Sequence, residues 1–177
     1  MDYPELSNEL LLLRLLGPGD FDKLYKVASD PAIWAIHPSP DRYKREVFQV
    51  FFDGAVASES AYLVYDRKSN ELIGSSRYYD FKPGESSIAI GYTFLATKVW
   101  GGYYNFSLKS LMLEYAFRFV DNVIFHIGAA NIRSQKALLK LGAVKTRDLS
   151  FETDGKPTPH YEYVITREAW EQVKLRH

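Results

Sequence analysis

The sequence has no cysteine, and this absence excludes a disulfide scaffold, a thiolate metal site and a cysteine nucleophile. It also lacks an excess of charge of either sign, because 22 Lys and Arg residues balance 22 Asp and Glu residues. A zero net charge argues against extensive contact with a nucleic-acid backbone and against a polybasic membrane anchor. We therefore expect neither a nucleic-acid partner nor a membrane partner.

Long apolar runs are missing as well. The runs that exist are only a few residues long and fall far short of a membrane span. The start, MDYPELSNEL, carries acidic residues where a secretory signal would have a basic segment followed by an apolar one. Together these absences predict a cytoplasmic protein.

Aromatic residues, in contrast, are plentiful, with 13 Tyr, 11 Phe and 3 Trp in 177 residues. They can fill a sizeable core and still leave rings to line a pocket. No internal repeat, low-complexity tract or linker interrupts the chain, so residues 1–177 are expected to form one domain.

Hydrophobic patterning predicts an antiparallel first half. Strands are expected at 10–16, 61–66, 71–80 and 87–95, and helices at 21–29 and 42–58. Pro31 is taken as the stop of the first helix. Gly91 lies in the middle of a predicted strand, where glycine marks a bulge or a close backbone approach.

In the second half of the sequence, predicted helices alternate with predicted strands. Helices are expected at 105–119, 131–141 and 167–174, and strands at 123–127, 143–149 and 161–165. This alternation implies a βαβ crossover joined to an antiparallel sheet. The predicted fold class is therefore α+β (mixed α/β), with a mostly antiparallel sheet of about seven strands and four or five helices.

Two segments could carry chemistry. In the first, residues 96–105, Gly101 and Gly102 precede the clearest helix, so backbone N–H groups and the helix dipole could hold a phosphate or pyrophosphate. The alternative is an ordinary tight turn. In the second, residues 130–143, Asn131 is a candidate N-cap with Ser134 at the third helical position. Taken alone, this second segment is simply a well-capped helix.

Considered together, these segments resemble one family. Trp-Gly-Gly-x-x-Asn opens a helix at Trp100, and Asn-x-x-Ser-x-x-x-Leu-x-x-x-Gly-Ala follows from Asn131 after an intervening strand. This order resembles the GNAT acetyltransferase superfamily, and most closely the branch that includes ribosomal-protein alanine N-acetyltransferases. Ile90 to Phe94, and Asn105 with Lys109, also fit that branch. The resemblance covers about residues 9–166.

The resemblance implies acetyl-CoA as donor, an amine as acceptor and no metal. It implies that backbone N–H groups near Phe94 and Leu95 stabilise the oxyanion, and that Ser134 protonates the leaving thiolate. Pantetheine would lie between the strand ending at Leu95 and the one starting at Val123. The implied CoA-binding residues are Phe94, Leu95, Lys98, Val99, Trp100, Gly101, Gly102, Tyr103, Tyr104, Asn105, Asn131, Arg133 and Ser134.

Several positions depart from the family pattern. Lys98 and Tyr103 occupy the first and last positions of the phosphate loop, where Gln or Arg and a small residue are usual. Ala89 stands where relatives often carry Glu, so the familiar carboxylate base is absent. The candidate replacements are Tyr78, Tyr79, Asp80, Glu85, Tyr92 and His37.

The acceptor side is predicted from residues near these segments. Ser134 and Tyr92 are the candidate catalytic residues, and Trp34, His37, Tyr79 and Tyr92 are the candidate acceptor-binding residues. Tyr78 and Tyr79 should point to opposite faces of their strand, one into the core and one toward the pocket. His126 is expected to be a core histidine and His160 a surface one.

Two other functions stay open. One is an acyl-CoA-binding module without catalysis, and the other is a different anion or nucleotide site. The sequence has neither Gly-x-x-x-x-Gly-Lys-Ser/Thr nor Gly-x-Gly-x-x-Gly, which argues against the second. The acceptor is either a protein N-terminus or a small-molecule amine, and pairing through the late strands could make a homodimer.

Overall fold

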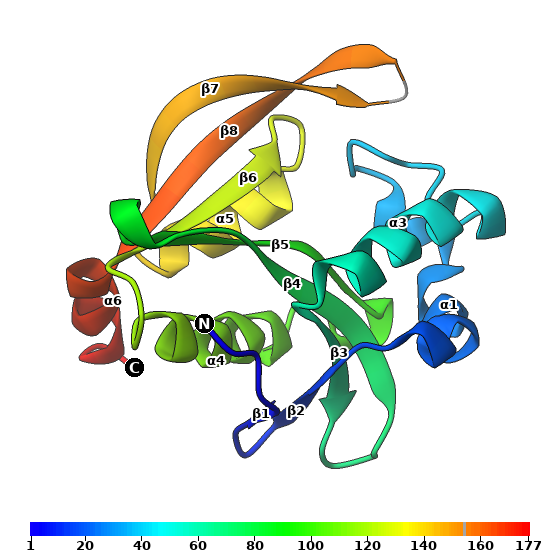
Figure 1. Ribbon diagram of the computed structural model, residues 1–177, viewed down its shortest axis with the longest axis horizontal. Coiled ribbons are helices and arrows are strands. Elements are labelled where there is room, and N and C mark those ends of the chain that lie inside the picture. Colours follow the sequence, from blue (N-terminus) through cyan, green and yellow to red (C-terminus); the bar gives the residue numbers. More distant parts are fainter. Residues whose placement is uncertain (154) are drawn as a thin grey trace.

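A computed structural model describes residues 1–153 and 155–177. It contains one eight-stranded sheet in the order β1-β2-β3-β4-β5-β6-β8-β7 (Figure 1). The strands are β1 (Leu6–Ser7), β2 (Leu11–Leu15), β3 (Ala61–Asp66), β4 (Leu72–Lys82), β5 (Ser87–Leu95), β6 (Asn122–Gly128), β7 (Val144–Thr153) and β8 (Lys156–Thr166). The α-helices are α1 (Phe21–Ala28), α2 (Pro31–Trp34), α3 (Arg45–Ser58), α4 (Tyr104–Ala116), α5 (Ile132–Lys140) and α6 (Arg167–Lys174).

The predicted mixed, mostly antiparallel class is confirmed, with two corrections to the counts. Within the described ranges the sheet has eight strands instead of about seven, because the two-residue β1 pairs with β2 and is too short to show a period. There are six α-helices instead of four or five, because Pro31 begins the short α2. Proline suits the first helical turn, and the Asp30 carboxylate caps that turn by accepting from the Ala32 N–H at 3.0 Å.

Two helical layers cover the two faces of the sheet. Tyr62 and Val64 of β3 pack in a core shared with α4, α5 and α6. Their neighbours Ala61 and Leu63 pack in a second core, with α1, α2 and α3. This alternation follows from the two-residue period of a strand. Figure 1 shows α1 and α3 on one side of the molecule and α4 to α6 on the other.

The middle of the sheet separates on one side and bulges on the other. β5 and β6 run parallel but pair only from Ser87–Asn122 to Ala89–Ile124. Between β4 and β5, Ser75 faces Phe94 whereas Arg77 faces Gly91, so two β5 residues oppose one residue of β4. A β-bulge therefore lies beside the point where β5 and β6 separate.

Glycine is required next to this bulge. A side chain at Gly74 would overlap the carbonyl oxygen of Phe94, and one at Gly91 would approach the Tyr79 ring to 2.9 Å. The bulge predicted from Gly91 is thus confirmed. The extra residue with the unusual backbone is its neighbour Tyr92, at φ 53°.

The late hairpin is longer than predicted. Its strands run over Val144–Thr153 and Lys156–Thr166, beyond the expected 143–149 and 161–165. Pro157 and Pro159 had indicated a loop, but they pair with β7 in a two-stranded ribbon that extends past the rest of the sheet (Figure 1). Proline is tolerated there because an outer ribbon has N–H groups that need no further partner.

No helix in the described ranges is long and apolar enough to cross a membrane. In the same ranges no group of three or more His, Asp or Glu side chains is placed to hold a metal ion.

Candidate active site

The glycine loop presents a row of backbone donors. A short 3-10 helix at Thr97–Val99 leads into Trp100, and Gly101 adopts φ +73° before α4 begins. Within the described residues, the N–H groups of Gly101, Gly102 and Tyr103 donate to no protein acceptor. All three residues are exposed. Consecutive free N–H groups beside the start of a 13-residue helix suit a phosphate or pyrophosphate.

Trp100 joins this loop to the start of α5. Its indole N–H donates to the Leu95 carbonyl oxygen at 2.9 Å. The centre of its ring lies 3.7 Å from the Arg133 guanidinium carbon, a cation–π contact. Partial desolvation lowers the pKa of Arg133. The two segments singled out in the sequence therefore meet in space.

The start of α5 is capped as predicted. The Asn131 side-chain oxygen accepts from the Ser134 N–H at 3.2 Å, which confirms the N-cap and the place of Ser134 in the first turn. The Ser134 hydroxyl is half-buried and bonds to no group in the described part of the protein. It is thus free to contact a ligand.

The strand register directs the backbone N–H groups of the two predicted oxyanion donors to opposite edges of β5. The Ala96 N–H donates to the Ile73 carbonyl at 2.7 Å, and Phe94 faces Ser75 in the same ladder. Because antiparallel ladders alternate, the Phe94 N–H points toward β4 and the Leu95 N–H points away from it. The contact of Trp100 with the Leu95 carbonyl agrees with this assignment. Leu95 thus faces the gap beside β6, whereas the Phe94 N–H belongs to the β4 ladder.

The side chains of the unusual loop positions contact groups outside the glycine pair. Lys98 forms an ion pair with Glu71, so its cation is engaged outside the loop. The Tyr103 ring packs against Phe106 at 5.2 Å and leaves its own N–H unbonded. Tyr104 and Asn105 lie half-buried in the first turn of α4, and Val99 closes the 3-10 helix before it.

Of the expected acceptor-site residues, Trp34 packs in the core, whereas the acceptor-binding role of His37 stays a prediction. Trp34 is only 1% exposed and its indole N–H donates to the Ala28 carbonyl, so it packs in the core and does not line a pocket. The His37 Nδ1 accepts from the Ser39 N–H at 3.0 Å. Burial, with Arg42 and His160 nearby, lowers the pKa of His37 to about 3. His37 is therefore a neutral turn residue and a weak base at neutral pH.

The candidate bases on β4 and the following turn lie in different environments. Tyr78 is buried in the core and donates to the Met112 carbonyl at 2.6 Å, while Tyr79 lies on the opposite face, as predicted. Asp80 and Glu85 are exposed at the surface, the latter near Lys82.

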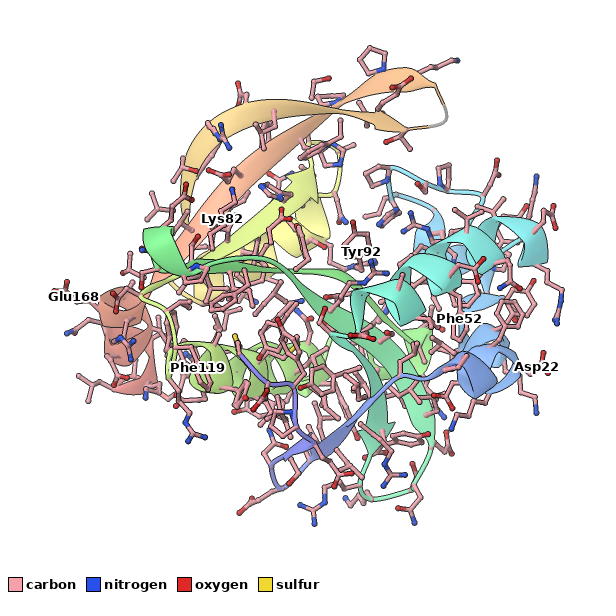
Figure 2. The ribbon with its side chains drawn as sticks, viewed as in Figure 1. Asp22, Phe52, Lys82, Tyr92, Phe119 and Glu168 are labelled. Carbon is pink, nitrogen blue, oxygen red and sulfur yellow. The ribbon has the colours of Figure 1, made fainter. Side chains whose placement is uncertain are left out.

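Tyr92 projects from the bulge on the same face as Tyr79. It is 44% exposed, and its ring lies 5.2 Å from the Tyr79 ring. Figure 2 shows the Tyr92 side chain beside α3. Beneath it the Arg77 guanidinium carbon lies 3.8 Å from the ring centre. Arg77 is buried, its Nε has no hydrogen-bond partner in the described residues, and burial lowers its pKa.

A hydrogen-bonded chain that the sequence did not indicate lies beside Tyr92. The Tyr79 hydroxyl is 2.9 Å from the His126 Nδ1, and the His126 Nε2 is 3.2 Å from a Glu162 carboxylate oxygen. Arg147 and Thr146 of β7 also donate to Glu162. His126 thus has both ring nitrogens hydrogen-bonded, as expected of a satisfied histidine, but at 17% exposure it lies at the edge of the core.

A buried lysine lies on the other side of the bulge. The Lys109 amine donates to the Thr93 hydroxyl at 2.7 Å and lies 5.7 Å from the centre of the Phe125 ring. Burial lowers the pKa of Lys109 to about 7. The sequence marked Lys109 through its pairing with Asn105 in the resemblance, but gave it no role.

One surface hollow lies between α1 and α3 and is lined in part by Phe21, Arg45 and Phe52. It shares no residue with the loop, the bulge or the hydrogen-bonded chain. The chemistry is therefore concentrated along β5 and its neighbours, not in that hollow.

The family follows from the sequence match. A model of the acetyltransferase (GNAT) domain matches residues 11–144, which include the bulge, the glycine loop and the start of α5. The chain belongs to the GNAT acetyltransferase domain family. This confirms the resemblance at the level of the superfamily. The narrower resemblance to ribosomal-protein alanine N-acetyltransferases stays a prediction.

Solved GNAT structures share the fold. A GCN5-related N-acetyltransferase from Brucella melitensis has a TM-score of 0.87 at 15% identity, covering 99% of this chain and 84% of that one. An acetyltransferase of the GNAT family from Bacillus anthracis gives 0.76 at 19%, covering 93% and 99%. Spermidine N-acetyltransferase from Vibrio cholerae, solved with CoA and spermine, gives 0.71 at 16%, covering 93% and 99%. No curated protein matches the chain significantly.

Proposed function

We propose that this GNAT protein transfers an acetyl group from acetyl-CoA to a primary amine, by direct attack of the amine on the thioester. The observation that carries the proposal is the bulged strand β5, which separates from β6 directly before a loop with three free N–H groups. A gap between strands suits an extended pantetheine arm, and the loop suits the pyrophosphate.

The residues of the site fit this co-substrate. Gly101, Gly102 and Tyr103 would bind the pyrophosphate through backbone N–H groups, with the Trp100–Arg133 pair closing one side. The Leu95 N–H, directed into the gap, would stabilise the developing oxyanion. The free Ser134 hydroxyl would donate a proton to the leaving thiolate. Tyr92 would line the acceptor side, where it is exposed beside Tyr79.

The acceptor is proposed at two levels. The class is a primary amine, in keeping with the family. Within it, a protein N-terminus rests on the resemblance of the motifs, and a small amine is compatible with the fold shared with a spermidine acetyltransferase. The sheet edge at β7 could pair two copies into a homodimer, which sedimentation would detect. We also propose that residues 1–177 form one domain and that the protein is cytoplasmic.

The first experiment is a thermal-unfolding titration with acetyl-CoA, with ATP and NAD as controls. A ligand at a hundred times its Kd adds about 2.7 kcal/mol to the free energy of unfolding. For a protein of this size, that should raise Tm by roughly 5 to 10 °C. A shift with acetyl-CoA alone supports the donor site, and no shift at millimolar concentration contradicts it.

The second experiment separates an enzyme from a binding module. Thiol release from acetyl-CoA is followed with a panel of acceptors that contains an alanine-leading peptide, spermidine and free amino acids. Turnover with any of them supports the enzyme. A Tm shift with no turnover across the panel would favour an acyl-CoA-binding module.

A further inference from the structure

We propose that Tyr79, His126 and Glu162 form a proton relay that deprotonates the acceptor amine. This inference rests on the proposed acetyl transfer and names the base for it. An amine must lose its proton before or during attack on a thioester, because the ammonium form has no free electron pair. The family's usual carboxylate position holds Ala89 here, so the base must come from elsewhere.

The relay lies beside the missing carboxylate. Tyr79 is the β4 partner of Ala89, and Ala89 is also opposite Ile124 in the last β5–β6 pair. His126 comes two residues after Ile124, on the portion of β6 that no longer pairs with β5. Tyr79 packs closely over Gly91, next to the bulge. The hydroxyl and the imidazole therefore lie where the two strands separate.

The hydrogen-bond directions follow from the groups involved. Burial alone would raise the pKa of Glu162, but hydrogen bonds from Thr146, Arg147 and His126 outweigh burial and lower it. An ionised carboxylate only accepts, so the His126 Nε2 must carry a proton and donate to it. In the neutral imidazole the Nδ1 is then an acceptor, and the Tyr79 hydroxyl donates to it. The lone pairs of Tyr79 remain for an incoming ammonium.

Each proton that the amine loses has a named acceptor. Before the nitrogen attacks the acetyl carbon, one ammonium N–H proton passes to the Tyr79 oxygen and the Tyr79 hydroxyl proton passes to the His126 Nδ1. As the C–S bond breaks, the Ser134 hydroxyl gives its proton to the leaving thiolate, and the second N–H proton of the nitrogen replaces it, so the products are the neutral amide, the free thiol and one proton on His126. The imidazolium that results is held by the Glu162 carboxylate at 3.2 Å. Tyr79 ends as a neutral phenol, which agrees with the raised pKa that burial gives it. The arrangement parallels an acid–histidine–hydroxyl triad.

The groups facing His126 come from each neighbouring strand. Tyr79 on β4 and Glu162 on β8 contact it directly, and Arg147 on β7 reaches it through Glu162. The Phe151 ring lies 5.4 Å from the His126 ring and 4.9 Å from the His160 ring. The His126 and Glu162 side chains are 17% and 12% exposed, so the relay is shielded from solvent but not sealed. A base in this place can exchange protons with water after each turnover.

The test compares kcat/KM against pH for the best acceptor in the panel. Replacing His126 by Gln keeps a polar side chain but removes the base, and Tyr79→Phe removes the hydroxyl while keeping the ring. Each should lower kcat/KM at pH 7 by about 10²- to 10⁴-fold. The loss should shrink about tenfold per pH unit toward the pKa of the amine, because free amine then enters directly. His160→Gln, the matched control, should keep the wild-type profile.

Acetyl-CoA titrations with each variant separate folding and donor binding from catalysis. Unchanged acetyl-CoA affinity with the pH-dependent loss supports the relay. A loss that is the same at every pH, or no loss, overturns the relay while leaving the acetyltransferase function intact. Absence of turnover by the unsubstituted protein overturns the proposed function, and the relay with it.

Discussion

Replacement of Lys109 by Met should remove a distinct part of the pH dependence of stability. The Lys109 amine lies in α4 under the bulge, with Thr93 as its hydrogen-bond partner and the Phe125 ring nearby. Burial lowers its pKa to about 7, whereas a lysine in the unfolded chain titrates at about 10.4. Between these values the folded protein holds a neutral amine and the unfolded chain holds a charged one.

The sign follows from proton linkage. Above pH 7 the unfolded chain binds more protons at this site, so the free energy of unfolding rises with pH until about 10. The slope approaches about 1.4 kcal/mol per pH unit, or about 2.7 kcal/mol between pH 7.5 and 9.5. Lys109 is buried, so solvent screening does not reduce this value. In Lys109→Met the increment is absent.

The other shifted groups are common to the wild type and the variant. The lowered pKa of His37 makes stability rise with pH between about 3 and 6.5, below the window. Burial raises the pKa values of several tyrosines, Tyr62 and Tyr79 among them, so they begin to lower stability near pH 9, where the unfolded chain loses protons first. Subtracting the variant's free energy of unfolding from that of the wild type cancels these contributions and isolates Lys109.

The assay is urea unfolding at several pH values in this range. The difference in the free energy of unfolding between the wild type and the Lys109→Met variant should grow by about 2.7 kcal/mol from pH 7.5 to pH 9.5. Lys26→Met, at an exposed position of α1, should leave the wild-type slope unchanged. Parallel curves for wild type and Lys109→Met would refute the reasoning and show that Lys109 stays charged in the fold.

Three further substitutions test the site and its scaffold. Gly101→Val forces a side chain into φ +73° at the loop, and should weaken acetyl-CoA by roughly tenfold or more in a titration. Gly155→Val, with φ +76° in the hairpin and open space around it, is the matched control and should leave affinity unchanged. Ser134→Ala should lower turnover more than acetyl-CoA affinity, and an equal loss of both would contradict its role as proton donor. Gly74→Ala should lower the free energy of unfolding by about 1–3 kcal/mol through overlap with the β5 backbone. Gly84→Ala, with nothing within 4 Å, should not.

The cofactor side of the site could be predicted because its signals are local. Gly101, Gly102 and the Asn131 cap act through backbone geometry within one turn of the chain, so their spacing in the sequence survives in the fold. The same local rules placed β3, β5 and α6 with the bounds that the structure has.

The hydrogen-bonded chain on the acceptor side could not be predicted in this way, although Tyr79 was among the candidates. This chain joins residues from three strands, and a lone histidine in an apolar strand gives no sign of the carboxylate that will face it. The prediction that Trp34 lines the acceptor pocket was wrong for a related reason. Helices α1 and α3 cover this tryptophan, and the sequence does not indicate how these helices pack. Long-range pairing decides both cases, and one sequence carries little information about it.

The strain at Tyr92 is best understood through the bulge that it serves. A bulky residue at φ 53° costs about 1–3 kcal/mol relative to an extended strand. The protein offsets this cost by packing the Tyr92 ring over Arg77 at 3.8 Å and beside Tyr79 at 5.2 Å. A regular β5 would need neither the strain nor the packing. It would keep its N–H groups in step with β4, and the Leu95 N–H and the Tyr79 hydroxyl would lose their common approach to the gap beside β6. The strained residue is therefore the element that brings the donor and acceptor sides of the proposed reaction together.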